Sequence, residues 1–344
     1  MSEQTAQAVK DLLRVRGLDV TYHRPRLRGG DVKAVRGVDL TVGRGETVGL
    51  VGESGSGKST IGSTVLGLVP ATGGSIEFDG ADITHSSRTD RRLLARRMQV
   101  VFQDPYGSMN PAHTVGDTLT EALRHNLELP ADEIRERVLR ALDDVGLPPG
   151  AAQRYPAAFS GGQRQRIAIA RALVMEPDFV VCDEAVSALD LSVQAQVLNL
   201  LARLKRTRGL SYLFISHDLA VVRYLSDTIV VLYAGRVVER GPAALVAGHP
   251  SHPYTRALLA AAPVPDPVVQ RRRRAERHLA ATATGGVSEG CAFAPRCPFA
   301  QETCWSAQPE LVEHDGVAVA CHRHDAIAAG TAVPGTTSAS AGAA

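Results

Sequence analysis

The feature that most constrains this chain is a glycine-rich turn placed between an apolar strand and a helix. The turn fits the pattern G-x-x-x-x-G-K-[ST], and its residues are Gly52, Glu53, Ser54, Gly55, Ser56, Gly57, Lys58, Ser59 and Thr60. Such a turn can wrap backbone N–H groups around a phosphate, with Lys58 reaching the β and γ phosphates and Ser59 offering its hydroxyl to Mg²⁺. The pattern therefore predicts a nucleoside triphosphate site rather than an ordinary Gly/Ser-rich turn.

Two adjacent carboxylates at the end of an apolar stretch supply the next constraint. Residues 179–183 predict a buried strand, and Asp183 and Glu184 stand at its carboxyl end. An acidic pair in this place often only caps a helix. With the phosphate turn upstream, Asp183 is expected to hold the metal and Glu184 to polarise the attacking water.

The remaining chain alternates strand and helix patterns, which indicates an α/β fold with a parallel sheet. Further strands are expected at residues 12–22, 31–42, 47–51, 74–80, 98–103, 211–216 and 227–234. Residues 115–146 predict a helical insertion, and helices are also expected at 161–175, 192–205 and within 249–262.

Charge and hydropathy narrow the classes of function. The 344 residues carry 38 basic and 36 acidic side chains, a formal charge of +2 that gives no reason to expect nucleic acid as a ligand. We find no apolar run long enough for a membrane span and no secretory signal at the N-terminus. The sequence therefore predicts a cytosolic protein that needs a partner for any membrane role.

A second small-residue turn makes a family resemblance specific. Residues 159–163 read Phe-Ser-Gly-Gly-Gln, in which Ser160, Gly161, Gly162 and Gln163 open a helix. This turn resembles the signature motif of ABC ATPases, which other phosphate-loop proteins lack. The resemblance implies that it closes over the γ-phosphate held by an opposite subunit, in a head-to-tail pair with two nucleotides between the domains.

Other positions follow the order of that family over about residues 12–245. Tyr22 resembles the aromatic that stacks on adenine, Gln103 the glutamine that senses Mg²⁺ and contacts a membrane subunit, and His217 the switch histidine. Residues 187–190, ending in Asp190, resemble the loop that crosses to the partner subunit. Each position alone has an ordinary explanation as packing, surface or capping. Ala185 departs from the family, which usually has proline after the two carboxylates.

The resemblance implies a phosphate-loop NTPase fold with a RecA-like core, an antiparallel β subdomain and a helical subdomain at about residues 104–160. We expect an ATP-binding domain at 1–250, a helix and linker at 251–290, a cysteine module at 291–324 and a disordered tail at 325–344. ATP and Mg²⁺ are the implied cofactors, and Lys58, Glu184 and His217 the implied catalytic groups.

Several stretches are similar to a narrower group, the ATP-binding subunits of oligopeptide and dipeptide permeases. They include residues 103–105, 108–111, 154–156 and 252–258, and the chain looks more like the second, F-type ATPase subunit. The implied partners are a different but related ATPase, two transmembrane permeases and an extracytoplasmic solute-binding protein, with uptake powered from the cytoplasmic face. Alternatives are import of another solute such as nickel, a soluble ABC-type ATPase of translation or repair, and a redox protein with a degenerate ATPase site.

Four of the five cysteines crowd one C-terminal stretch. Cys291, Cys297, Cys304 and Cys321 are separated by five, six and sixteen residues, unlike the paired spacing of common zinc ribbons. We expect a [4Fe–4S] cluster, with Zn²⁺ and free or disulfide-linked thiols as alternatives, and Arg296 as a candidate to offset its charge. Cys182 is expected to be a buried core residue. The arginine run at 271–274 is either a solvated linker or a lipid contact.

Overall fold

The structure is a computed structural model that describes residues 11–23, 30–104, 107, 109–261, 290–329 and 331. Pro105, Ser108, the arginine run at 271–274 and the tail beyond residue 331 lie outside these residues. The tail expected to be disordered from residue 325 begins instead within a helix, His324–Ala328. Within the described part of the chain, no helix is both long and apolar enough to cross a bilayer.

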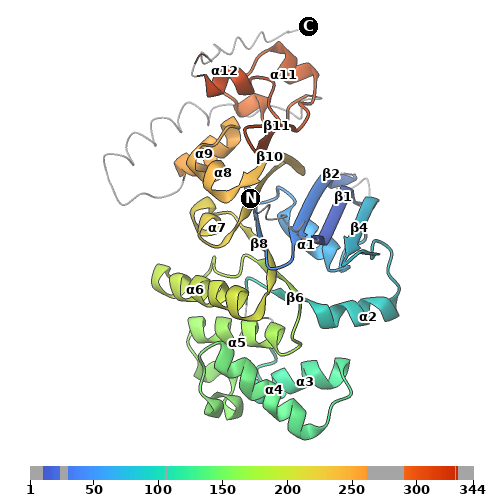
Figure 1. The fold of residues 1–344 in the computed structure, drawn as a ribbon, viewed down its shortest axis with the longest axis vertical. Coiled ribbons are helices and arrows are strands. Elements are labelled where there is room, and N and C mark those ends of the chain that lie inside the picture. Colours follow the sequence, from blue (N-terminus) through green and yellow to red (C-terminus); the bar gives the residue numbers. More distant parts are fainter. Residues whose placement is uncertain are drawn as a thin grey trace, which may run out of the picture.

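The strands form two sheets, which Figure 1 shows beside each other in the middle of the molecule. The smaller sheet has the order β2-β1-β4-β5 and is antiparallel; its strands are β1 (Asp11–Tyr22), β2 (Val32–Gly43), β4 (Gly73–Phe78) and β5 (Ala81–Asp82). The larger sheet has the order β11-β12-β10-β9-β3-β8-β7-β6. Its strands are β3 (Thr47–Val51), β6 (Met98–Val101), β7 (Phe179–Asp183), β8 (Ser211–Ser216), β9 (Thr228–Tyr233), β10 (Arg236–Pro242), β11 (Val312–His314) and β12 (Val317–Val319).

The strands β9, β3, β8, β7 and β6 run parallel, with β6 at the edge of the sheet, and β3 and β8 in the middle are buried on both faces. Alternate side chains of one strand enter opposite cores because successive residues of a strand point to opposite faces. Phe179 and Val181 join the core beneath the antiparallel sheet, whereas Val180 and Cys182 join the core against the helices. The parallel sheet predicted from strand and helix alternation is therefore confirmed.

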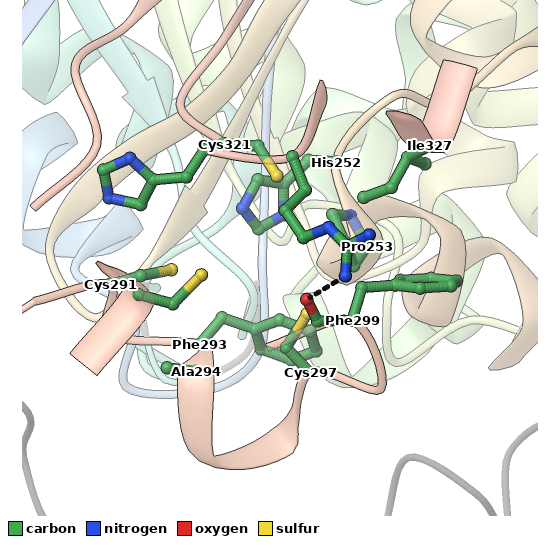
Figure 2. Close-up of a pocket in the computed structure, with 12 residues that line it drawn as sticks. His252, Pro253, Cys291, Phe293, Ala294, Cys297, Phe299, Cys321 and Ile327 are labelled. Atoms are coloured by element: carbon green, nitrogen blue, oxygen red, sulfur yellow. Dashed lines mark hydrogen bonds between the residues drawn. The ribbon is translucent and has the colours of Figure 1, made fainter. Parts of the chain in front are cut away.

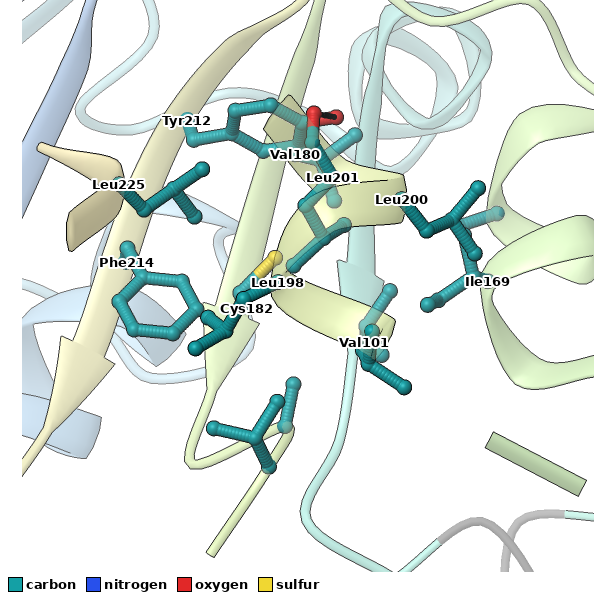
Figure 3. Close-up of a cluster of buried hydrophobic side chains, with 14 of the residues drawn as sticks. Val101, Ile169, Val180, Cys182, Leu198, Leu200, Leu201, Tyr212, Phe214 and Leu225 are labelled. Carbon is teal, nitrogen blue, oxygen red and sulfur yellow. Dashed lines mark hydrogen bonds between the residues drawn. The ribbon is translucent and has the colours of Figure 1, made fainter. Parts of the chain in front are cut away.

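Cys182 is fully buried, as expected from its apolar neighbours, and Figure 3 shows it among Val101, Leu198 and Phe214. Burial raises the pKa of its thiol to about 12, so it stays neutral in the core.

The helices lie around the sheets, with α3, α4 and α5 together at one end of the molecule in Figure 1 and α11 and α12 at the other. They are α1 (Lys58–Val65), α2 (Arg88–Arg97), α3 (Val115–Asn126), α4 (Ala131–Asp144), α5 (Gly161–Leu173), α6 (Leu191–Arg208), α7 (Leu219–Leu225), α8 (Ala243–Gly248), α9 (Pro253–Ala261), α11 (Glu302–Ser306) and α12 (His324–Ala328).

The helical stretch at 115–146 consists of two helices, because residues 127–130 interrupt the pattern. α3 ends at Asn126 and Pro130 precedes the first residue of α4. Pro130 cannot continue a preceding helix but is well tolerated where a new one begins.

The sequence patterns missed β10, the strand that joins the parallel strands of the large sheet to the C-terminal strands β12 and β11. β9 turns into β10 through Ala234 and Gly235, with φ of 48° and 81°. Two residues at positive φ make a tight hairpin turn. β12 then pairs with β10, with Glu239 opposite Val319, so the C-terminal segment extends the main sheet.

Candidate functional site

The phosphate turn joins the end of β3 to the start of α1, in a close-packed setting. A Cβ at Gly52 would lie 2.2 Å from the Leu232 carbonyl oxygen, and one at Gly57 would lie 2.4 Å from the Ala34 carbonyl oxygen. Gly57 also has φ of 104°, which other residues rarely adopt. No side chain in the described part of the chain caps α1, so its first N–H groups point at the turn. The turn is built as an anion cradle.

Lys58 lies over this turn and is only 4% exposed. Its Nζ donates to the carbonyl oxygens of Gly52 and Glu53, at 2.8 Å each. Burial lowers the pKa of Lys58, and the negative charges of Glu184 and Asp183 oppose that shift. A cation with acidic groups on one side and a phosphate cradle on the other is suited to a triphosphate.

Ser59 and Asp183 meet beside the lysine, as the sequence patterns suggested. The Ser59 hydroxyl donates to Asp183 Oδ1 at 2.9 Å, which joins the start of α1 to the end of β7. Burial raises the pKa of the Asp183 carboxyl, and the hydrogen bond from Ser59 opposes the rise. A hydroxyl and a carboxylate are the hard oxygen ligands that Mg²⁺ prefers, so these residues fit the ion.

Glu184 follows directly, in a backbone conformation that few non-glycine residues adopt. Its φ is 50°, and its N–H donates to the Ile215 carbonyl oxygen at 3.0 Å. His217 Nδ1 lies 3.4 Å from Glu184 Oε2. Strain of this kind persists where the surroundings fix the residue and concentrates at functional sites. The carboxylate is thus held in one place, with an imidazole beside it.

The turn after Glu184 is closed in spite of Ala185 replacing the family's proline. The N–H and the hydroxyl of Ser187 donate to the Glu184 carbonyl oxygen at 3.1 and 3.0 Å, and Ala185 is buried. Asp190 caps α6 by accepting from the N–H groups of Ser192 and Val193.

The signature turn opens α5 through a reciprocal capping box. Ser160 Oγ accepts from the Gln163 N–H at 3.3 Å, and Gln163 Oε1 accepts from the Ser160 N–H at 3.0 Å. A Cβ at Gly162 would lie 2.4 Å from Val193 Cγ1, so the turn packs closely on α6. In Figure 1, α5 and α1 lie in different parts of the molecule. One chain therefore does not bring this turn to its own phosphate loop.

The two remaining predicted residues lie at strand ends. Tyr22 ends β1, is 38% exposed, and its hydroxyl lies 3.4 Å from Thr60 Oγ1. Its partly exposed ring thus lies near the start of α1. Gln103 is exposed two residues after β6.

Sequence analysis missed a contact between the cysteine stretch and the phosphate loop. The Arg296 guanidinium donates to both carboxylate oxygens of Glu53, at 2.8 and 2.9 Å. Arg296 thus has a carboxylate partner in the phosphate loop, and its expected role beside a thiolate cluster stays a prediction. No local pattern could show this pairing, because 243 positions separate the partners.

The four C-terminal cysteines line one pocket, together with His252 and His322 among others. Figure 2 shows Cys291, Cys297 and Cys321 on different sides of a common space. Cys304 lies beside Cys291, because the Cys291 N–H donates to the Cys304 carbonyl oxygen. Burial raises the pKa of Cys297 to about 12 and that of Cys321 to about 11.

The spacing of these sulfurs is wider than one tetrahedral ion requires. Among the described residues, only His314, His324 and Asp325 bring three candidate ligand atoms within 4.8 Å of one another. A Zn–S bond of about 2.3 Å in a tetrahedron would place sulfurs about 3.8 Å apart. The rings of His314 and His324 stack at 4.0 Å, so their lone pairs do not converge on one ion.

The site combines a phosphate loop, an Asp–Ser pair and a glutamate whose position is fixed by its backbone, all at the ends of parallel strands. This combination defines a nucleotide hydrolase of the phosphate-loop class. Residues 35–187 match the family described as ABC transporter, and residues 238–304 match the oligopeptide/dipeptide transporter C-terminal region.

Similar proteins agree with these matches. A Brucella ovis protein named for peptide import and ATP binding is 49% identical over 88% of this chain and 94% of its own length. A Sinorhizobium fredii protein named as a peptide ABC transporter ATP-binding protein is 48% identical over 85% of this chain and 82% of its own length.

Solved structures give the same fold. The protein cbiO1 of Clostridium perfringens, part of the ABC transporter complex cbiONQ, has a TM-score of 0.62 at 31% identity, over 70% of this chain and 91% of that one. A dimeric ATP-binding cassette bound to ADP and Pi has a TM-score of 0.60 at 27% identity, over 67% of this chain and 98% of that one. The chain belongs to the ABC transporter family of ATP-binding subunits and is an ATPase.

Proposed function

We propose that this ATPase powers the uptake of peptides through a membrane permease. The observation that carries the proposal is the oligopeptide/dipeptide transporter C-terminal region, present in one chain with an intact nucleotide site. The names of the Brucella and Sinorhizobium relatives support peptides over nickel or another solute. The same region argues against a soluble ATPase of translation or repair.

The proposed assembly holds a second, related ATPase subunit, two transmembrane permeases and an extracytoplasmic solute-binding protein. The chain would act at the cytoplasmic face, with Gln103 exposed for a membrane subunit. In the head-to-tail pair, Ser160, Gly161, Gly162 and Gln163 of one subunit close over the nucleotide of the other. The separation of α5 from α1 within one chain supports this arrangement.

To test the substrate, the assembled transporter is placed in vesicles with its binding protein. ATP hydrolysis should rise when the binding protein carries a peptide. A rise with nickel ions and none with peptides would contradict peptide import while leaving the ATPase assignment intact.

Within the site, we assign Lys58 to the β and γ phosphates and Ser59 and Asp183 to Mg²⁺, which neutralises phosphate charge when bound. Tyr22 would stack on adenine, and Glu184 would accept a hydrogen bond from the attacking water. His217, 3.4 Å from Glu184, would hold that carboxylate in place.

The role of Glu184 predicts that Glu184→Gln keeps ATP binding but stops turnover. The amide preserves the size of the side chain and removes the negative charge that polarises water. We expect hydrolysis by the assembled complex to fall by about 100-fold or more, with ATP retained at the site. Hydrolysis at the wild-type rate would remove Glu184 from this role.

For the cysteine pocket, we propose a [4Fe–4S] cluster rather than zinc. Four thiols line one space, yet no three of the described sulfurs lie within 4.8 Å, and a four-iron cluster is wider than one ion. Protein purified without oxygen should be brown, absorb in the visible and contain iron and sulfide. A colourless protein with one equivalent of zinc would reverse the assignment.

A further inference from the structure

The cysteine segment contacts the nucleotide site directly, at the second residue of the phosphate loop. Arg296 and Glu53 form a two-pronged ion pair, with the arginine side chain 34% and the glutamate side chain 44% exposed. The Arg296 guanidinium also lies 5.6 Å from the Phe293 ring centre. Paired hydrogen bonds between planar groups fix geometry as well as charge.

A second contact holds the backbone of the same residue. The Glu53 N–H donates to the Tyr254 hydroxyl at 2.8 Å. Tyr254 is completely buried, and its ring lies 4.5 Å from that of Tyr233 and 5.4 Å from that of Phe293. Its own N–H donates to His252 Nδ1 at 3.0 Å. Glu53 is therefore held by side chain and backbone from the C-terminal side.

The charge of Glu53 is unfavourable for the ligand of this loop. A carboxylate one residue into a turn that binds a triphosphate repels the ligand unless a cation neutralises it. The negative charge of Glu53 acts on the Lys58 ammonium, whose Nζ also bonds the Glu53 carbonyl oxygen. Arg296 is the cation paired with that carboxylate.

We propose that Arg296 and Tyr254 are positioning residues of the nucleotide site, supplied by the segment C-terminal to the cassette. Arg296 neutralises Glu53 so that the loop accepts a polyanion, and Tyr254 fixes the loop backbone at the same residue. The proposal rests on ATP binding alone, and neither the transported solute nor the metal of the cysteine pocket enters it.

The test is nucleotide binding to the purified full-length chain, measured by calorimetry with a non-hydrolysable ATP analogue, ADP and AMP. Arg296→Met should weaken binding of the ATP analogue about fivefold, ADP less and AMP least, because repulsion grows with ligand charge. The loss should shrink at high salt, since the pair is partly exposed. Arg256→Met is the control, because Arg256 lies on the same helix as Tyr254 and its Nε donates to the Pro250 carbonyl oxygen, not to a group of the loop.

The double-variant cycle separates charge neutralisation from simple folding. Glu53→Gln should bind the ATP analogue as tightly as the wild type or more tightly, and adding Arg296→Met to it should cause no further loss. An Arg296→Met loss that is equal for all three nucleotides, or that persists in the Glu53→Gln background, would overturn the proposal. Thermal melting checks that each variant is folded. If Arg296→Met does not fold, Glu53→Gln alone is the test, and a fivefold weakening of its binding of the ATP analogue would overturn the proposal.

Tyr254→Phe tests the backbone contact separately. Removing the hydroxyl leaves the Glu53 N–H without its acceptor, so the loop loosens without any change in charge. Binding of all three nucleotides should weaken about equally. Unchanged binding, or a loss graded by ligand charge, would contradict the role given to Tyr254.

Discussion

At the scale of single residues, the nucleotide site contains buried charged groups and a strained backbone that lower the stability of the fold when no nucleotide is bound. Lys58 is almost fully buried, Glu184 adopts a positive φ, and burial raises the pKa of Asp183. Stability and function therefore conflict at this site, because each group is placed for a ligand and not for packing.

Asp183 makes this conflict measurable. A carboxyl whose pKa is raised by folding stabilises the fold only while protonated, and that contribution is lost as pH rises through the unfolded and then the folded pKa. At neutral pH, Asp183→Asn should therefore raise the melting temperature of the nucleotide-free chain, by about 2 °C, with Mg²⁺-dependent hydrolysis lost. The gain should diminish on acidification.

Asp82→Asn is the control for this prediction. Hydrogen bonds from Thr84 lower the pKa of Asp82, so its loss should lower the melting temperature at neutral pH. Melting curves recorded over a pH series show whether each of the two substitutions raises or lowers the melting temperature. A lower melting temperature for Asp183→Asn would show that its charge stabilises the empty site.

At the scale of elements, the first residues of a helix can both stabilise the helix and belong to the nucleotide site. α3 and α5 begin with the same reciprocal capping box, built by Thr114 with Asp117 and by Ser160 with Gln163. The α5 box was visible in the sequence as a small-residue turn before a helix. The split of 115–146 into α3 and α4 and the β9–β10 hairpin were missed, because Pro130 and the Ala234–Gly235 turn interrupt the periodic patterns only briefly.

The two boxes allow a matched comparison. Ser160→Ala and Thr114→Ala should each destabilise the chain by about 1 kcal/mol, the usual cost of losing such a cap. Only Ser160→Ala should also lower ATP hydrolysis by the assembled transporter, since only that turn is assigned to a partner's nucleotide. Denaturant unfolding and hydrolysis measured on both variants give the comparison; equal hydrolysis would count against the signature assignment.

At the scale of the whole molecule, the C-terminal segment is built into the ATPase. β12 adds to the main sheet beside β10, and the buried Glu239 of β10 accepts from the N–H groups of Ser251 and His252. Burial lowers the pKa of His252 to about 3, so it packs as a neutral ring in the wall of the cysteine pocket. The C-terminal segment that lines the pocket is thus bonded to the main sheet through β12 and to the phosphate loop through Tyr254 and Arg296.

The sequence by itself determined the nucleotide chemistry and the alternation of strands and helices that builds the parallel sheet. Lys58, Ser59, Asp183 and Glu184 lie in short motifs whose geometry is local to one turn or one strand end. Only the tertiary structure decided that Glu53 pairs with Arg296 and that four unevenly spaced cysteines line one pocket. Such contacts join distant segments, and they depend on how whole elements pack, which no local pattern of residues records.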